Sequence, residues 1–259
     1  MNEMELNQVQ HPKKQALQTN ISGFDVLFND GGIPTGSTVL IAGSTGTGKS
    51  TLCRQICYNA IKSGSRCMYV SFEESKQQIM ESMQSFGWNV SEFVESGQFF
   101  IQNINPLDIL RMKFGSLGGS GSATELSSKV KPLVIPSDLN PEIIVVDSLS
   151  AIIAASLTKE KNYRVYLQQL FSFFKDTKAT SLLVTETDPI PIRFSESGIE
   201  EFLADGIIVL YNIQKTEGKV NALEVLKMRY GQHSKHIVEM NITQNGIEVF
   251  PDRNITFQD

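Results

Sequence analysis

Residues that could bind phosphate lie close together in the first fifth of the chain. Residues 43–51 contain a glycine, four further residues and then Gly48, Lys49 and Ser50, which is the spacing of a phosphate-binding loop, or P-loop. In such a loop, successive backbone N–H groups surround a polyphosphate and the glycines adopt conformations that a side chain would block. The pattern assigns Lys49 to the terminal phosphates and Ser50 to Mg²⁺. It predicts these nucleotide-binding residues: Thr45, Gly46, Thr47, Gly48, Lys49, Ser50 and Thr51.

The segments on either side of the loop decide between a nucleotide site and a chance glycine-rich turn. Residues 38–42 form a short apolar run that is typical of a buried parallel strand. A helix is expected after the loop, with Gly64 at its C-terminal cap. The order of strand, loop and helix favours the nucleotide site. The expected helix has these residues on its apolar face: Leu52, Cys53, Ile56, Cys57, Ala60 and Ile61.

Asp147 ends the apolar run of residues 142–147. The carboxyl end of a strand is where α/β sheets bind ligands. A carboxylate in this position holds Mg²⁺ in P-loop proteins, directly or through water. Many strands end in Asp, but together with the P-loop the position predicts a magnesium ligand.

Glu73 and Glu74 follow another expected strand, residues 67–72. Two adjacent carboxylates would repel a triphosphate, so one interpretation is that one of them positions and deprotonates the attacking water. The other interpretation is a solvated turn before the next helix, where acidic residues are favoured. Ser75 and Gln78 are spaced as a capping box for that helix. The residues alone leave both interpretations open.

Lys227 and Arg229 lie two apart in an expected strand, so we expect them on one face, with Leu226 and Met228 on the opposite face. Both cations could simply be solvated. They could also act in trans, as a finger that reaches the nucleotide of a neighbouring subunit. His233 follows closely. The spacing alone favours solvated side chains.

The alternation of expected strands and helices indicates an α/β fold with a mainly parallel central sheet flanked by helices. A helix is expected over residues 159–177, with Val165, Leu167, Leu170, Phe171 and Phe174 facing inward. Residues 207–210, 222–229, 237–240 and 247–250 are expected to form antiparallel strands at the sheet edge. We expect a domain over residues 19–251, a glycine-rich insertion around 113–124, and tails over 1–18 and 252–259.

Composition limits the function classes. The chain has 259 residues and a formal net charge of -5, which argues against a broad electrostatic surface for nucleic acid. Three cysteines do not form a disulfide framework, and we expect reduced, buried thiols rather than a metal site. The longest apolar region, residues 143–157, is interrupted by polar residues and is too short to span a bilayer. The N-terminus has no signal-peptide pattern, so we expect a cytoplasmic protein without membrane insertion.

Several further motifs, in order along the chain, resemble the KaiC family of RecA-like P-loop ATPases, which is named after a cyanobacterial clock protein. The similarity spans roughly residues 19–250. Its segments are residues 19–25, 31–36, 71–74, 85–88, 146–148, 201–205 and 226–229.

The resemblance implies roles that the residues alone leave open. It implies ATP and Mg²⁺ as cofactors and an ATPase with Glu73, Glu74 and Lys49 as catalytic residues. It places Ser85 near the nucleotide. It also implies a homo-oligomer, commonly a hexameric ring, in which nucleotide lies at the subunit boundary. The neighbouring subunit would then contribute Lys227, Met228, Arg229, Gly231 and His233 in trans.

Departures from the family pattern narrow the expected activity. The clock protein has two such domains, the second of which phosphorylates itself on a Ser–Thr pair. Here the corresponding residues are Glu201 and Phe202, which have no hydroxyl, so autokinase activity is not expected. Tyr230 replaces a usual glycine.

The function expected from the resemblance is regulatory or signalling ATP hydrolysis. One alternative is a slow, ATP-dependent assembly switch for a protein partner that the sequence does not identify. Another is a DNA-dependent ATPase of the RecA or RadA type, which no basic run supports.

Overall fold

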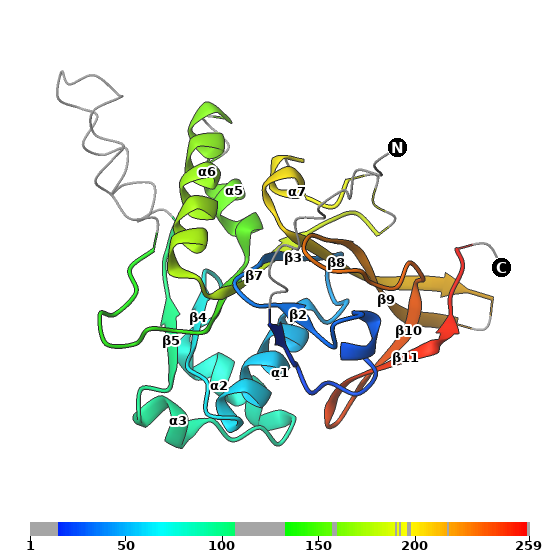
Figure 1. The fold of residues 1–259 in the computed structure, drawn as a ribbon, viewed down its shortest axis with the longest axis horizontal. Coiled ribbons are helices and arrows are strands. Elements are labelled where there is room, and N and C mark those ends of the chain that lie inside the picture. The colour runs from blue at the N-terminus through cyan, green and yellow to red at the C-terminus, as the bar shows by residue number, and fades with distance from the viewer. Residues whose placement is uncertain are drawn as a thin grey trace, which may run out of the picture.

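The computed structural model describes residues 15–106, 133–156, 160–189, 191, 193–195, 198–216 and 218–257. The glycine-rich insertion predicted around residues 113–124 lies outside the described residues. Within them, a nine-stranded sheet forms the centre of the molecule, with the strand order β11-β10-β9-β8-β3-β7-β6-β4-β5 (Figure 1). The strands are β3 (Thr38–Gly43), β4 (Cys67–Ser71), β5 (Phe99–Asn103), β6 (Ile143–Asp147), β7 (Thr180–Glu186), β8 (Gly206–Lys215), β9 (Gly218–Met228), β10 (Val238–Thr243) and β11 (Gly246–Asn254).

The sheet has a parallel and an antiparallel part. Strands β8, β3, β7, β6, β4 and β5 pair in parallel, whereas β9, β10 and β11 extend the sheet in antiparallel pairs from β8. This confirms the predicted fold class. Two short strands, β1 (Ala16–Leu17) and β2 (Ile33–Pro34), form a separate antiparallel pair. The segment between them contains a 3₁₀ helix, η1 (Asp25–Leu27).

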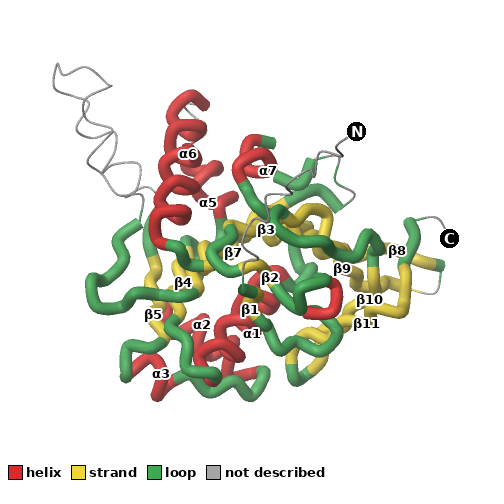
Figure 2. Tube along the Cα trace, in the orientation of Figure 1, coloured by secondary structure: helices red, strands yellow, loops and turns green. Residues whose placement is uncertain are grey.

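Helices lie on both faces of the parallel part of the sheet, as Figure 2 shows. Parallel strands covered on both faces are apolar along their whole length, and every residue of β3, β4 and β6 is buried. Two cores result, one on each face. The helices of the first face are α1 (Lys49–Lys62), α2 (Lys76–Ser85) and α3 (Ser91–Glu95), and those of the second are α5 (Leu149–Ser156), α6 (Glu160–Thr177) and α7 (Ile199–Leu203).

Local sequence signals position the helices that border the site. The predicted apolar face of α1 is buried, and the cysteines of the chain are buried free thiols. At α2 the predicted capping box is present: the Gln78 N–H donates to Ser75 Oγ (3.3 Å) and the Ser75 N–H donates to Gln78 Oε1 (2.8 Å). These bonds fix where the chain turns after the segment that carries Glu73 and Glu74.

One residue of the predicted inward face of α6 is placed wrongly. Leu167, Leu170, Phe171 and Phe174 are buried, but Val165 is 49% exposed. Residues two positions apart in a helix are separated by about 200° around its axis, so Val165 lies nearly opposite Leu167. Tyr166 takes the inward position instead.

The predicted alternation at the end of β9 is also wrong. Leu226 packs against the core of the second face, whereas Met228 is buried in the core of the first. The register of β8 and β9 shifts between Ile207 and Ile208, which marks a β-bulge. An extra residue in one strand reverses the faces of the residues that follow it.

The described strands extend past both predicted domain boundaries. β1 starts at Ala16, within the segment predicted as an N-terminal tail, and β11 continues to Asn254, beyond residue 251. Pairing of β11 with β10 satisfies backbone groups that a free tail would leave to water.

The packing of α6 can be tested by two truncations. Phe171→Ala should lower the free energy of unfolding by about 3–5 kcal/mol, because it leaves a cavity in the core of the second face. Val165→Ala, the control on the same helix, should change it by less than about 0.5 kcal/mol. Chemical unfolding at one fixed protein concentration measures both. Equal costs for the two variants would show that α6 does not pack as described.

Candidate nucleotide-binding site

The P-loop opens into a cavity at the carboxyl edge of the parallel strands. The loop follows β3, and the neighbouring strands β7, β6 and β4 end at the same edge. The cavity has a volume of about 310 Å³. It therefore collects residues from five segments that are far apart in the sequence. Its lining includes Thr45, Gly46, Gly48, Lys49, Ser50, Thr51, Glu73, Asp147, Ser148, Val184, Glu186 and Ile242.

The P-loop backbone has the shape that phosphate binding needs. Gly46 has a φ of +80° and an added Cβ there would meet nothing within 4 Å, so the loop is open on this side. Gly48 has a φ of +96°, and an added Cβ would lie 2.7 Å from Ile242 Cδ1. Gly48 also precedes α1 without a side-chain cap. The first N–H groups of α1 thus have no capping side chain and can face an anion.

Lys49 is a buried cation at the base of the cavity. Its Nζ donates to the carbonyl oxygens of Gly43 and Ser44, each at 2.9 Å. Burial lowers the pKa of Lys49, and the carboxylates of Glu186 and Asp147 act in the opposite direction. Since Nζ is held by two neutral carbonyls, phosphate oxygens can replace them as stronger, charged acceptors.

Asp147 is fixed at the end of β6. It is 8% exposed, and Tyr69 donates its hydroxyl hydrogen to Asp147 Oδ2 (2.5 Å). Burial raises the pKa of Tyr69, and the charge of Asp147 raises it further, so the phenol stays protonated and remains a donor.

Ser50 and Asp147 both line the cavity and carry oxygen donors for a metal ion. Across the part of the chain that the structure describes, no group of three or more His, Cys, Asp or Glu residues could hold a metal ion by itself. A hydroxyl and a carboxylate nevertheless fit Mg²⁺, which takes few protein ligands and completes its coordination with phosphates and water.

The two adjacent glutamates lie in different surroundings. Both backbone N–H groups donate to Ser71 Oγ, at 3.2 Å from Glu73 and 2.9 Å from Glu74. Glu73 lines the cavity, and Ser148 Oγ donates to its Oε1 (3.4 Å). The side chain of Glu74 is instead hydrogen-bonded and ion-paired to Arg54. Glu73 is therefore the carboxylate of the pair that faces the cavity.

Two predicted nucleotide-binding residues are not among the described residues that line the cavity. Thr47 is buried, and its hydroxyl donates to the Ser44 carbonyl within the loop (2.8 Å). Ser85 lies at the end of α2, where its hydroxyl donates to the Ser82 carbonyl (2.7 Å). Thr47 thus supports the loop from within.

Lys227 and Arg229, predicted to act in trans, contact the C-terminal end of α7 in their own chain. Lys227 Nζ donates to the carbonyls of Glu201 and Ala204, each at 2.7 Å. Arg229 donates to the Phe202 carbonyl (3.1 Å) and lies 3.5 Å from Asp205 Oδ1. The Arg229 side chain is nevertheless 44% exposed, so it can also reach a second molecule.

The other residues predicted in trans differ in how accessible they are. Met228 is 8% exposed, so its side chain faces its own core. Gly231 and His233 are half-buried. His233 Nδ1 lies 2.8 Å from the Ser234 carbonyl and its Nε2 3.1 Å from Lys235 Nζ. Donation from Nδ1 to the carbonyl and acceptance at Nε2 from the ammonium group would satisfy both contacts.

The prediction from sequence missed four polar or charged residues in and around the site. Glu186 ends β7 at the cavity and accepts a hydrogen bond from Thr45 Oγ1 (3.3 Å). The argument made for Asp147, a carboxylate at the tip of an apolar strand, would have identified it. Ser148, Tyr69 and Arg54 carry no such signal, since their roles depend on tertiary contacts.

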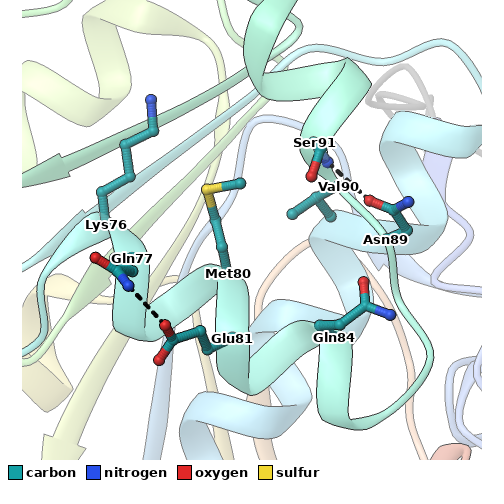
Figure 3. A pocket seen from close by; sticks show the side chains of 8 residues that line it. All are labelled: Lys76, Gln77, Met80, Glu81, Gln84, Asn89, Val90 and Ser91. Carbon is teal, nitrogen blue, oxygen red and sulfur yellow. Dashed lines mark hydrogen bonds between the residues drawn. The ribbon is translucent and has the colours of Figure 1, made fainter.

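A second and larger hollow, of about 470 Å³, contains none of the predicted site residues (Figure 3). It lies between α2 and residues 89–91, with Met80 and Val90 as its apolar lining. Gln77 and Glu81 on its rim are hydrogen-bonded to each other (2.8 Å). Size alone therefore does not identify the functional site.

None of the described helices is both long and apolar enough to cross a membrane.

Comparisons with known proteins agree with this geometry. The circadian clock oscillator protein KaiC 1 of Synechocystis is 30% identical over 254 residues, which cover 95% of this chain and 47% of that protein. The circadian clock oscillator protein KaiC of Synechococcus elongatus is 28% identical over 250 residues, 95% of this chain and 46% of that protein. The chain thus spans about half the length of these relatives.

A solved structure has the same fold. The KaiC-like protein of the hyperthermophilic archaeon Pyrococcus horikoshii is 31% identical, with a TM-score of 0.74 over 92% of this chain and 100% of that one. A family model described as "ATPase: KaiC" matches residues 17–254. The chain belongs to the KaiC family of RecA-like P-loop ATPases.

Proposed function

We propose that this protein binds ATP with Mg²⁺ in the P-loop cavity and hydrolyses it, as one subunit of a ring in which nucleotide lies between subunits. The observation that carries the proposal is that Lys49, Asp147 and Glu73 line one cavity, although they follow three different strands. Charge stabilisation, metal binding and proton transfer each have a residue there. Membership of the KaiC family supports the choice of ATP.

The phosphates would be held by the loop and by the start of α1. Lys49 exchanges its bonds to the Gly43 and Ser44 carbonyls for phosphate oxygens, and the N–H groups around Gly48 add fixed partial charges. Ser50 and Asp147 would hold Mg²⁺, which when bound draws negative charge from the phosphate oxygens.

The attacking water would be oriented by Glu73, which lines the cavity and accepts from Ser148. The water oxygen forms a bond to the γ-phosphorus while the bond to the ADP oxygen breaks, and Glu73 accepts the proton. Glu74 is less suited to this role, because Arg54 engages its carboxylate.

A neighbouring subunit would complete the site with Arg229. Its side chain is partly exposed, and its contacts to the end of α7 hold it in place before any subunit approaches. A cation supplied from outside stabilises charge that develops in the transition state. Such head-to-tail contacts between identical subunits close into a ring when their rotation returns to the first subunit.

Lys49→Ala should lower phosphate release by at least about 100-fold, because the cation nearest the transferred phosphate is lost. Lys62→Ala is the matched control, since Lys62 is an exposed lysine at the opposite end of the same helix. Light scattering with and without ATP, on the same samples, reports assembly in parallel. Unchanged turnover in Lys49→Ala would refute the assignment. Assembly on ATP without turnover in the wild type would favour a switch over an enzyme.

Arg229→Ala should lower turnover by on the order of 10³-fold if Arg229 acts as an arginine finger. Its action in trans can be tested by co-expressing Arg229→Ala with Lys49→Ala under two different tags. In random rings about one quarter of the interfaces then combine an intact P-loop with an intact Arg229, so part of the activity should return.

The control for this complementation is Lys49→Ala co-expressed with the double variant that lacks both residues. None of its interfaces contains an intact P-loop. If the first mixture is as inactive as this control, Arg229 does not act across a subunit boundary.

A further inference from the structure

Arg54 is a buried arginine beneath the P-loop that the mechanism above leaves without a role. It lies on α1 one turn after Ser50, and residues four apart share a helix face. It is 5% exposed. A buried guanidinium needs acceptors for its donors, because leaving them unsatisfied is costly. Its partners therefore show what it does.

The guanidinium connects three other segments to α1. Nη1 donates to Ser82 Oγ on α2 (2.7 Å), and Nε donates to the hydroxyl of Tyr69 on β4 (3.3 Å). Nη2 binds Glu74, in the segment after β4. Burial by itself lowers the pKa of Arg54, but the interactions with Tyr69 and Glu74 outweigh it and the net shift is upward. Arg54 is thus a permanent positive charge.

Arg54 also reaches the proposed metal ligand. Its Nη2 lies 3.9 Å from Asp147 Oδ2, and the same oxygen accepts the hydrogen bond from Tyr69 (2.5 Å). Arg54 and Tyr69 thus both interact with this oxygen, and the Asp147 residue lines the cavity. Groups that support a metal ligand in this way fix its orientation.

The charge of Arg54 matters because Glu73, Glu74 and Asp147 lie near a site for a polyanion. A carboxylate that turned freely into the cavity would repel phosphate and compete for the attacking water. Arg54 engages Glu74, whereas Glu73 lines the cavity with a hydroxyl donor, Ser148. The planar guanidinium can hold several acceptors in fixed directions, which a lysine cannot do.

We propose that Arg54 is a positioning residue of the ATPase site: it keeps Glu74 turned away from the cavity and, with Tyr69, fixes Asp147 for Mg²⁺. The effect on turnover rests on the proposed function. The effect on Mg²⁺ does not require hydrolysis. The two can therefore be tested separately.

The first test compares Arg54→Met and Arg54→Lys with the wild type. Binding of a fluorescent ATP analogue is measured in EDTA and then against increasing Mg²⁺. Arg54→Met should bind the analogue more weakly in EDTA, because the freed Glu74 repels its phosphates, and should require roughly 10–100-fold more Mg²⁺ for the metal-dependent increase, and kcat should fall by a similar factor. Arg54→Lys should recover part of both losses, because lysine restores the positive charge but not the planar guanidinium with its several fixed donors.

The matched control is Arg66→Met. It removes an exposed arginine that directly precedes β4, at the other end of this strand from Glu73 and Glu74. It should leave Mg²⁺ dependence and kcat unchanged. If Arg54→Met behaves like Arg66→Met in both measurements, the proposal is wrong. If the wild type binds the analogue but does not hydrolyse ATP, the proposed function fails while the Mg²⁺ titration still decides the role of Arg54.

Two further variants distinguish positioning from folding. Tyr69→Phe keeps the ring, whose centroid lies 5.6 Å from the Arg54 guanidinium carbon, but removes the hydrogen bond to Asp147. It should raise the Mg²⁺ requirement even if Arg54→Met does not fold. Adding Glu74→Gln to Arg54→Met should restore activity relative to Arg54→Met alone, because the uncompensated charge disappears. The proposal is wrong if Glu74→Gln lowers activity by the same factor in Arg54→Met as in the wild type and Tyr69→Phe has a normal Mg²⁺ dependence.

Discussion

Under the proposed function, repulsion between carboxylates and a phosphate-containing ligand is the main constraint at this edge of the sheet. Glu73, Asp147 and Glu186 line the P-loop cavity, and Glu74 lies just behind it. Bringing a triphosphate among them is favourable only if fixed positive charge and oriented dipoles outweigh the repulsion. Lys49, the N–H groups at the start of α1 and Arg54 supply these. The remaining packing of the molecule serves to keep them there.

The two buried cations on α1, Lys49 and Arg54, differ in their partners. Lys49 is bonded to neutral backbone carbonyls and faces the cavity, so its charge remains available for phosphate. Arg54 is already engaged with a carboxylate and cannot serve a ligand without releasing it. The first cation is suited to binding and the second to holding the site in shape.

Much of the fold and the centre of the site could be predicted because their signals are local. Apolar runs gave the parallel strands, and the P-loop spacing gave Lys49 and Ser50. Prediction failed where a shift of one residue changes the face on which a side chain lies. Val165 lies on the outer side of α6, and a β-bulge places Leu226 and Met228 on different faces of the sheet. Arg54 could not be identified as part of the site, since a charged residue on an apolar helix face indicates neither its partners nor its depth.

Under the proposed function, the placement of Arg54 on α1 makes phosphate binding and carboxylate positioning properties of one helix. Ser50 and Arg54 are one turn apart, about 6 Å along the helix axis. A ligand that shifts the first turn of α1 must also shift the guanidinium, and with it the acceptors on Glu74 and Tyr69. Thermodynamic linkage makes this coupling reciprocal, so whatever fixes Glu74 and Asp147 also favours the P-loop conformation that binds phosphate. No separate relay between the P-loop and the carboxylates is needed, because α1 is itself the connection.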